Sequence, residues 1–306
     1  MAHVIDGEIV EARVILDGTI PAGTVLPARL ANVGISGRNA VAIAEGGVEF
    51  LLPRGAPGIT QGATLIIEVT REAIPGREPW KRPLARVTDK APEGVDRSFA
   101  HARTLPFPAP HDALNDVGWD ELIDQARTGT VAFAGGELRL SATPAMTLID
   151  VDGYLEPEAL AVLGASEAAV AIRRLDIGGS IGIDLPTTNS KAARQSAAAT
   201  IDRLLAQPFE RTAVNGFGFV QIVRPRPRAS LLELAQDRAS FEARALLRRI
   251  AFGAPGAARL VVAPAVGDVI ERHPPWLDAL SAQVGGAIEL RRDATVTISG
   301  AYAEAA

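Results

Sequence analysis

The chain has 306 residues, a formal net charge of −5 and no cysteine. This length is enough for two or three folded units, and the absence of cysteine excludes disulfides and any zinc site built from thiolates. Because no apolar run is long enough to span a membrane and the first residues lack the order of a signal peptide, we expect a soluble, cytoplasmic protein with no membrane partner.

The N-terminal segment alternates between apolar and polar residues, a pattern typical of two short strands. Asp17-Gly18 is a turn signal within it. We therefore expect a first hairpin over residues 1–20.

Residues 21–90 contain short β patterns separated by glycine. Five segments stand out, and they read TVLPARLANV, AVAIAE, EFLLPRG, TLIIEVTREA and PLARVT. Regularly spaced short strands with turn signals are typical of a small barrel, and five of them fit an OB-fold.

Residues 91–118 are rich in proline and lack periodicity, so we expect a linker. His101 and His111 lie in this stretch without a cysteine or a suitably spaced histidine. A zinc site is therefore not expected.

The stretch from 119 to 235 carries the main chemical signal. We expect GGELRLSA and AMTLIDVDG to pair as a hairpin, a helix over 155–176, and a strand within IGGSIGIDLP. Strand, helix and strand form a crossover unit whose strands are parallel, so Asp150 and Asp184 should converge. Two carboxylates suit Mg²⁺, whereas the alternative is that both are ordinary turn and cap residues.

Basic residues follow the second aspartate, with seven of them against two acidic residues over 191–228. After a helix over 190–206, Arg224, Arg226 and Arg228 alternate, so an extended strand would place them on one face. Such a row suits a phosphate backbone, and the alternative is a solvated sheet edge.

The last part, 236–306, predicts a small α/β unit. We expect LLELAQDRASFEARAL to run through as helix, followed by helices over 266–272 and 276–284. The expected strands cover 258–263, 287–291 and 295–299.

Three blocks, GGELRLSATPAMTLIDVDG, RRLDIGGSIGIDLP and VNGFGFVQIVRPRPRASL, together resemble the catalytic core of the ribonuclease E/G family. The resemblance spans about residues 135–231 and implies a mixed α/β (α+β) fold. A ribonuclease H-like catalytic domain would cover 119–235 and include the first hairpin, with an S1-type RNA-binding barrel inserted over 21–90.

The resemblance also implies an activity, namely Mg²⁺-dependent endonucleolytic cleavage of single-stranded RNA in RNA processing or decay, with Mn²⁺ as a possible substitute. Asp150 and Asp184 would be catalytic metal ligands, joined by Asp152, which stands where the family has asparagine. The residues expected to bind RNA are Phe50, Trp80, Lys81, Arg82, Arg211, Arg224, Arg226 and Arg228. The alternative for Phe50 is that its side chain belongs to the barrel core and does not contact RNA.

The chain departs from the family in several places. It lacks the cysteine pair that joins two subunits through zinc, so any homodimer must form without zinc. Arg103-Thr104 is a weak counterpart of the 5′-end sensor, and Thr187 stands where the family often has an acidic residue. Two alternatives to the enzyme are a non-catalytic RNA-binding protein on the same scaffold and an interaction protein with no RNA role, which the negative net charge favours.

Overall fold

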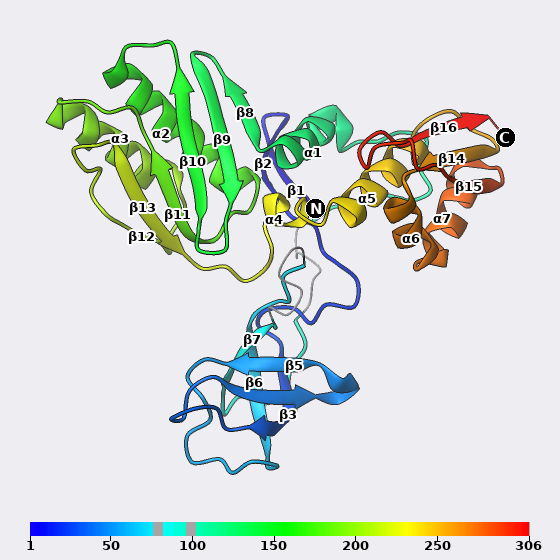
Figure 1. Cartoon of the computed structure of the whole chain (residues 1–306), viewed down its shortest axis with the longest axis horizontal. Coiled ribbons are helices and arrows are strands. Elements are labelled where there is room, and N and C mark those ends of the chain that lie inside the picture. Colours follow the sequence, from blue (N-terminus) through cyan, green and yellow to red (C-terminus); the bar gives the residue numbers. More distant parts are fainter. Residues whose placement is uncertain (76–81, 96–101, 306) are drawn as a thin grey trace.

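The structure is a computed structural model of the chain, and it describes residues 1–75, 82–95 and 102–305. The chain is a mixed α/β protein with three separate apolar cores. Figure 1 shows them as a barrel, a six-stranded sheet with its helices, and a smaller C-terminal unit. Among the described residues, no helix is both long and apolar enough to span a membrane.

The chain begins with a hairpin of β1 (Ala2–Ile5) and β2 (Glu8–Ala12). Its turn is Asp6-Gly7, where both residues have positive φ angles, 51° and 82°. Asp17-Gly18 does form a turn, but it lies beyond the end of the hairpin, so its predicted place within the hairpin is wrong. The hairpin ends at β2, where Ile9 and Ala12 pack into the core of the six-stranded sheet.

Five strands close into a barrel in the order β3-β4-β5-β7-β6. The strands are β3 (Val25–Asn32), β4 (Ala40–Ala44), β5 (Glu49–Leu52), β6 (Thr64–Arg71) and β7 (Leu84–Val87). A one-turn 3-10 helix, η1 (Glu45–Gly47), joins β4 to β5. Each strand falls within one of the five predicted segments, so the barrel prediction is confirmed, and a five-stranded barrel is compatible with an OB-fold.

The six-stranded sheet has the order β12-β13-β11-β10-β9-β8. Its strands are β8 (Thr130–Phe133), β9 (Gly136–Ala142), β10 (Thr147–Gly153), β11 (Gly179–Asp184), β12 (Glu210–Arg211) and β13 (Phe219–Arg224). The predicted β9–β10 hairpin is confirmed. The helix α2 (Pro157–Arg174) connects β10 to β11, and these two strands pair in parallel.

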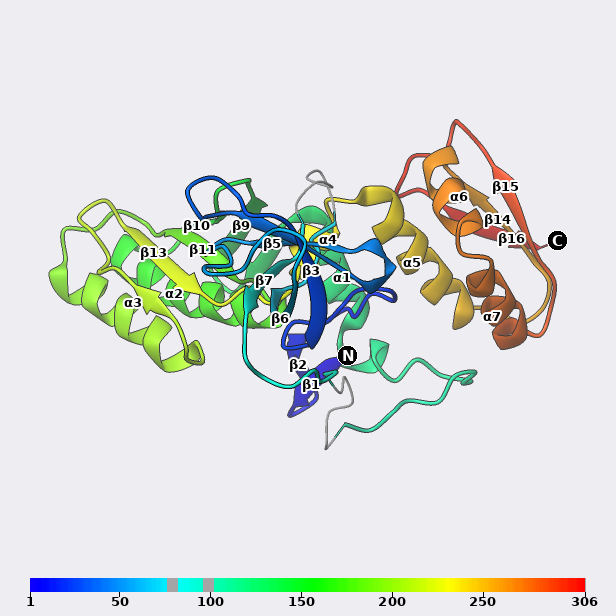
Figure 2. The same ribbon diagram turned by 90° about the horizontal axis from the view of Figure 1, so that it is seen from below.

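One face of this sheet is covered and the other is open. Along β10 and β11, Ile149, Val151, Ile181 and Ile183 are buried, and they share one core with α2 and α3 (Lys191–Leu204). Both helices lie on the same side of the sheet (Figure 2). The residues that alternate with these four isoleucines and valines along β10 and β11, including both candidate aspartates, therefore occupy the uncovered face.

The remaining helices link the sheet to the C-terminal unit. They are η2 (Asn115–Val117), α1 (Trp119–Thr128), α4 (Leu231–Leu234), α5 (Arg238–Ala251), α6 (Pro264–Glu271) and α7 (Pro274–Val284). The helix predicted to run through 231–246 is instead two helices. Ser230 forms a capping box with Glu233 on α4, and Asp237 caps α5, so two caps divide the stretch.

The C-terminal sheet has the order β15-β14-β16, with β14 (Ala258–Val262), β15 (Ile288–Arg292) and β16 (Tyr302–Ala305). The strand predicted at 295–299 is wrong, because that segment contains turns and the last strand starts at Tyr302. Pairing of β16 with β14, antiparallel along the sheet edge, decides where the strand lies.

Candidate metal and nucleic-acid site

Asp150 and Asp184 lie directly opposite each other on the parallel strands β10 and β11. Neighbouring strands are about 4.8 Å apart, so the two backbones are close and both side chains project from the open face. Both residues are exposed. The prediction that these aspartates meet on adjacent strands is confirmed, although Asp150 lies within β10 and only Asp184 ends its strand.

The carboxylates influence each other electrostatically. Partial burial raises the pKa of Asp150, and the negative charges of Asp152 and Asp184 raise this pKa further. The guanidinium of Arg139 lowers the pKa of Asp150 and so opposes this shift. A bound cation would relieve the repulsion between the like charges.

Arg139 is a residue of this site that the sequence analysis did not identify. It lies opposite Asp150 on β9 and is 60% exposed in its side chain. Its guanidinium contacts Glu137 at 2.6 Å and Asp152 at 3.3 Å. The predicted hairpin contained the signal, because the register of GGELRLSA against AMTLIDVDG places this arginine beside Asp150.

Asp152 is two positions beyond Asp150 on the same face, about 7 Å further along the strand. Its carboxylate pairs with Arg139. Within residues 1–75, 82–95 and 102–305, no group of three or more His, Cys, Asp or Glu side chains is arranged to hold a metal ion. Asp150 and Asp184 form a pair of carboxylates, which fits an ion such as Mg²⁺ that keeps several waters and takes one or two carboxylates plus phosphate. A metal-binding role for Asp152 stays a prediction.

A small apolar patch adjoins the carboxylates. Gly182 lies on β11 two residues before Asp184, and a Cβ there would be 2.6 Å from the Phe219 ring and 3.1 Å from Leu148. The ring of Phe219 and the Leu148 side chain therefore close over this glycine. Leu148 remains 39% exposed, so the patch borders solvent.

Two exposed aromatic residues flank the same region of the sheet. Phe217 is 80% exposed in the turn before β13, whose Phe219 lies opposite Asp184. Tyr154 is 83% exposed immediately after β10. The hydroxyl of Thr187 donates to the Phe217 carbonyl at 3.0 Å and fixes this turn next to the end of β11. Sequence analysis missed both rings because exposure cannot be read from residue type.

The arginine row has a different arrangement from the one predicted. β13 ends at Arg224, so Arg226 and Arg228 are not on one strand face with it, and that part of the prediction is wrong. Arg224 donates to the Ile177 carbonyl at 3.1 Å, and burial lowers its pKa.

Three more arginines of the sheet unit that were predicted to bind RNA each pair with a carboxylate. Arg226 pairs with Glu233, and Arg228 pairs with Asp176 at 2.8 Å. Arg211 pairs with Asp202, which raises the pKa of Arg211. RNA binding by these arginines stays a prediction, and it would require these ion pairs to be shared or broken.

The barrel residues that were predicted to bind RNA differ in how exposed their side chains are. Phe50 is fully buried in the barrel core, so it offers no surface for stacking and the core alternative is correct. Arg82 is exposed and pairs with Glu49 at 2.6 Å. Trp80 and Lys81 lie outside the described residues.

Asp150→Asn should stabilise the metal-free protein at neutral pH. A raised pKa in the folded state means that folding is opposed once the carboxylate ionises, so stability falls as pH rises from the unfolded pKa through the folded pKa. Because the group is exposed, we expect a rise of only about 1–2 °C in melting temperature at pH 7, corresponding to a few tenths of a kcal/mol.

The measurement is thermal melting of wild type and Asp150→Asn in EDTA between pH 3 and pH 7. The two curves should meet at the acidic end, where the wild-type carboxyl is protonated, and separate as pH rises. A variant that is less stable than wild type at pH 7 would contradict repulsion within the pair.

No family model matches the chain, and no curated protein matches it.

Proposed function

We propose that the open face of the six-stranded sheet is the active face of a Mg²⁺-dependent endoribonuclease that cleaves single-stranded RNA. The observation that carries the proposal is the pairing of Asp150 with Asp184 on adjacent parallel strands, with both carboxylates exposed. The resemblance of the surrounding sequence blocks to the ribonuclease E/G family supports the choice of RNA as substrate.

Asp150 and Asp184 would hold the ion through carboxylate oxygens, and Mn²⁺ could take the same place. When bound there, Mg²⁺ supplies positive charge to the scissile phosphate and makes water a better nucleophile. The raised pKa of Asp150 supports this role, because the pair repels itself without a cation. No zinc is needed in this arrangement.

Other residues of the open face would position the substrate. Arg139 is beside Asp150 and its exposed guanidinium is suited to a phosphate oxygen. Phe217 and Tyr154 offer exposed rings on which unpaired bases can stack. By the family resemblance, the products would carry a 5′-phosphate and a 3′-hydroxyl.

The ribonuclease H-like identity of the sheet unit and the S1 type of the barrel belong to the same proposal. The closed barrel with five strands supports an OB-type RNA-holding module. Any homodimer would form without zinc, as the sequence contains no cysteine. Cytoplasmic RNA processing or decay is the role that this activity would serve.

The direct test incubates the purified full chain with an end-labelled single-stranded RNA in Mg²⁺, in Mn²⁺ and in EDTA. Cleavage in either metal and none in EDTA is expected. If the protein binds the RNA but leaves it intact in both metals, the second candidate holds, a non-catalytic RNA-binding protein. That candidate is favoured because, among the described residues, no three or more His, Cys, Asp or Glu side chains are grouped to hold a metal ion.

Arg139→Ala and Arg226→Ala should differ in their effect on RNA binding. The first removes a guanidinium whose ion pairs with Glu137 and Asp152 are exposed to solvent and can be shared with a phosphate, so the logarithmic salt dependence of RNA affinity should flatten by about one unit. The second removes a guanidinium whose ion pair with the capping residue Glu233 is largely buried, so it should leave the salt slope unchanged and lower the free energy of unfolding by about 1 kcal/mol.

The measurement is RNA affinity by fluorescence anisotropy over a series of salt concentrations, with urea unfolding of each variant. A reduced slope for Arg226→Ala together with an unchanged slope for Arg139→Ala would reverse the assignment. The segment after β13 that carries Arg226 would then be the part of the chain that contacts phosphate.

A further inference from the structure

A cavity of about 670 Å³ lies between α5, α7 and the segment 103–114. Its volume is within the range of about 300–1,000 Å³ that is typical of small-molecule sites. α5 and α7 pack against each other in the C-terminal unit, away from the strands that carry Asp150 and Asp184 (Figure 1). The cavity therefore shares no residue with the open sheet face.

The cavity has mainly apolar walls. α5 and its end contribute Leu247 and Phe252, while α7 contributes Trp276 and Leu280. The segment 103–114 adds Phe107, which is 54% exposed and therefore reaches the opening. A ligand that fills this space must present a largely apolar body.

The segment that forms the outer wall is held in place by specific contacts. The carboxamide of Gln283 on α7 accepts from the Ala109 backbone N–H at 2.8 Å and donates to the Ala109 carbonyl at 2.6 Å. Asp112 pairs with Arg248 of α5. Residues 109–112 of the predicted linker thus pack against α5 and α7, and the cavity is a built feature of the fold.

Arg244 is the polar group that defines the chemistry of the cavity. Its guanidinium lies 5.2 Å from the centre of the Trp276 ring, and the His273 ring stacks on the same tryptophan with 4.1 Å between the ring centres. One Nη donates to the Ser240 carbonyl at 3.0 Å. Among the described residues, no carboxylate forms an ion pair with this guanidinium.

The surroundings of Arg244 contrast with those of Arg248, one turn later on α5, which has Asp112 as its partner. Burial lowers the pKa of Arg244, and the charges of Asp237 and Asp17 only partly oppose this from a longer distance. A partly buried guanidinium without an ion pair is costly, and a carboxylate offers the planar, two-oxygen acceptor that matches it best.

We propose that this cavity binds a small amphipathic monoanion, with an apolar chain or ring system against Leu247, Phe252 and Leu280 and a single carboxylate on Arg244. Arg244 is the one cation of the described lining that is both partly buried and without an ion pair, which favours a ligand with one negative charge over nucleotides and other polyanions. Arg103, an exposed residue of the same lining, adds positive charge and disfavours cationic ligands.

The test is isothermal titration of the full chain with three probes of equal chain length, dodecanoate, dodecanol and dodecylamine. Dodecanoate and dodecylamine are kept below their micelle concentrations, and dodecanol is kept below its solubility limit. We expect saturable binding of one dodecanoate per chain, at least tenfold tighter than dodecanol, and no measurable binding of dodecylamine. Arg244→Gln should reduce dodecanoate affinity to that of dodecanol. Arg272→Gln, an exposed arginine of the same unit outside the cavity, should leave it unchanged.

A second variant covers the case in which Arg244→Gln fails to fold. Ala279 lines the cavity from an exposed position on α7, so Ala279→Trp fills the space without removing core contacts. It should abolish binding of both dodecanoate and dodecanol. Equal affinity for the acid and the alcohol, binding unaffected by Ala279→Trp, or no saturable binding in the wild type would each overturn the proposal.

Discussion

Asp184→Asn is expected to reduce RNA cleavage by roughly 100-fold or more, a loss of at least about 2.7 kcal/mol of transition-state stabilisation. The change removes one charged ligand from the pair with Asp150 while keeping the size of the side chain. Because Asp184 is exposed at the end of β11, the fold should be retained. RNA affinity should stay within about twofold of wild type, since we propose that other residues contact the phosphates and bases.

The measurement compares cleavage at limiting Mg²⁺ and RNA affinity in EDTA for wild type, Asp150→Asn and Asp184→Asn. Asp278→Asn is the matched control, because it makes the same charge change at an exposed site on α7. Wild-type cleavage by either pair variant would show that the residue is not a metal ligand. Loss of RNA binding with cleavage would instead assign the aspartates a role in holding substrate.

Gly218→Ala should lower the free energy of unfolding by about 2–4 kcal/mol, from the cost of a left-handed conformation and the forced displacement of a neighbour. Gly218 has a φ of +93°, and a Cβ there would lie 2.0 Å from the Leu185 carbonyl oxygen. This glycine brings the turn that carries Phe217 against Leu185 at the end of β11. The strand that follows the turn, β13, pairs with β11 (Figure 1). Cleavage should therefore fall together with stability, because Leu185 directly follows Asp184.

Gly216→Ala is the control for this change. It lies two residues earlier in the same turn, no atom lies within 4 Å of its added Cβ, and its φ is not in the left-handed region. We expect a change within about 0.5 kcal/mol, the usual size at open surface sites. Urea unfolding followed by circular dichroism compares the two. Equal stability of both variants would contradict the proposed close approach of Gly218 to Leu185.

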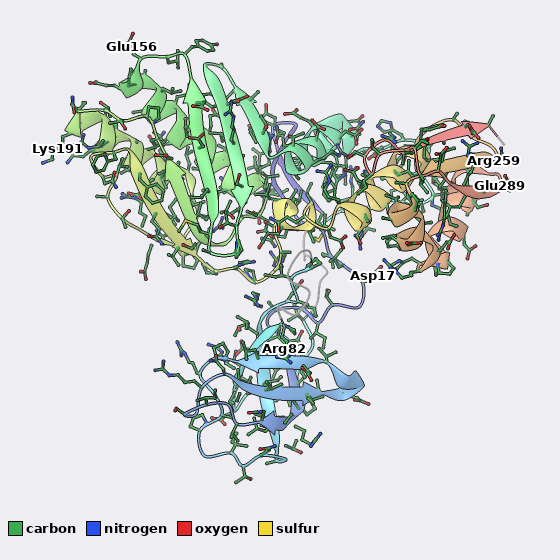
Figure 3. The ribbon with its side chains drawn as sticks, viewed as in Figure 1. Asp17, Arg82, Glu156, Lys191, Arg259 and Glu289 are labelled. Atoms are coloured by element: carbon green, nitrogen blue, oxygen red, sulfur yellow. The ribbon has the colours of Figure 1, made fainter. Side chains whose placement is uncertain are left out.

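The partners of charged side chains cannot be predicted from local sequence patterns alone. Figure 3 shows charged residues across all three units, including Arg82 on the barrel and the pair Arg259 and Glu289 on the C-terminal sheet. Arg259 and Glu289 face each other across β14 and β15 with a distance of 2.9 Å. Such partners are thirty residues apart in sequence, so their pairing depends on strand register.

The sequence by itself determined the features that depend on local periodicity. Alternation with period two, interrupted by glycine, located all five barrel strands, and helical spacing located α2. The right-handed crossover rule then placed β10 beside β11, so the meeting of Asp150 and Asp184 was predictable. Each of these inferences needed only neighbouring residues and a general rule of chain topology.

Tertiary structure decided the features in which local signals were equal or incomplete. Asp6-Gly7 and Asp17-Gly18 are the same dipeptide, and only the packing of β2 in the sheet core selects the first as the hairpin turn. Alternation could not say which side of β5 faces the barrel interior, so the burial of Phe50 was left open. Likewise, pairing with Glu233 and Asp176 occupies Arg226 and Arg228 through contacts made by folding. The physical reason is that periodicity assigns side chains to a face, whereas long-range packing determines what covers that face.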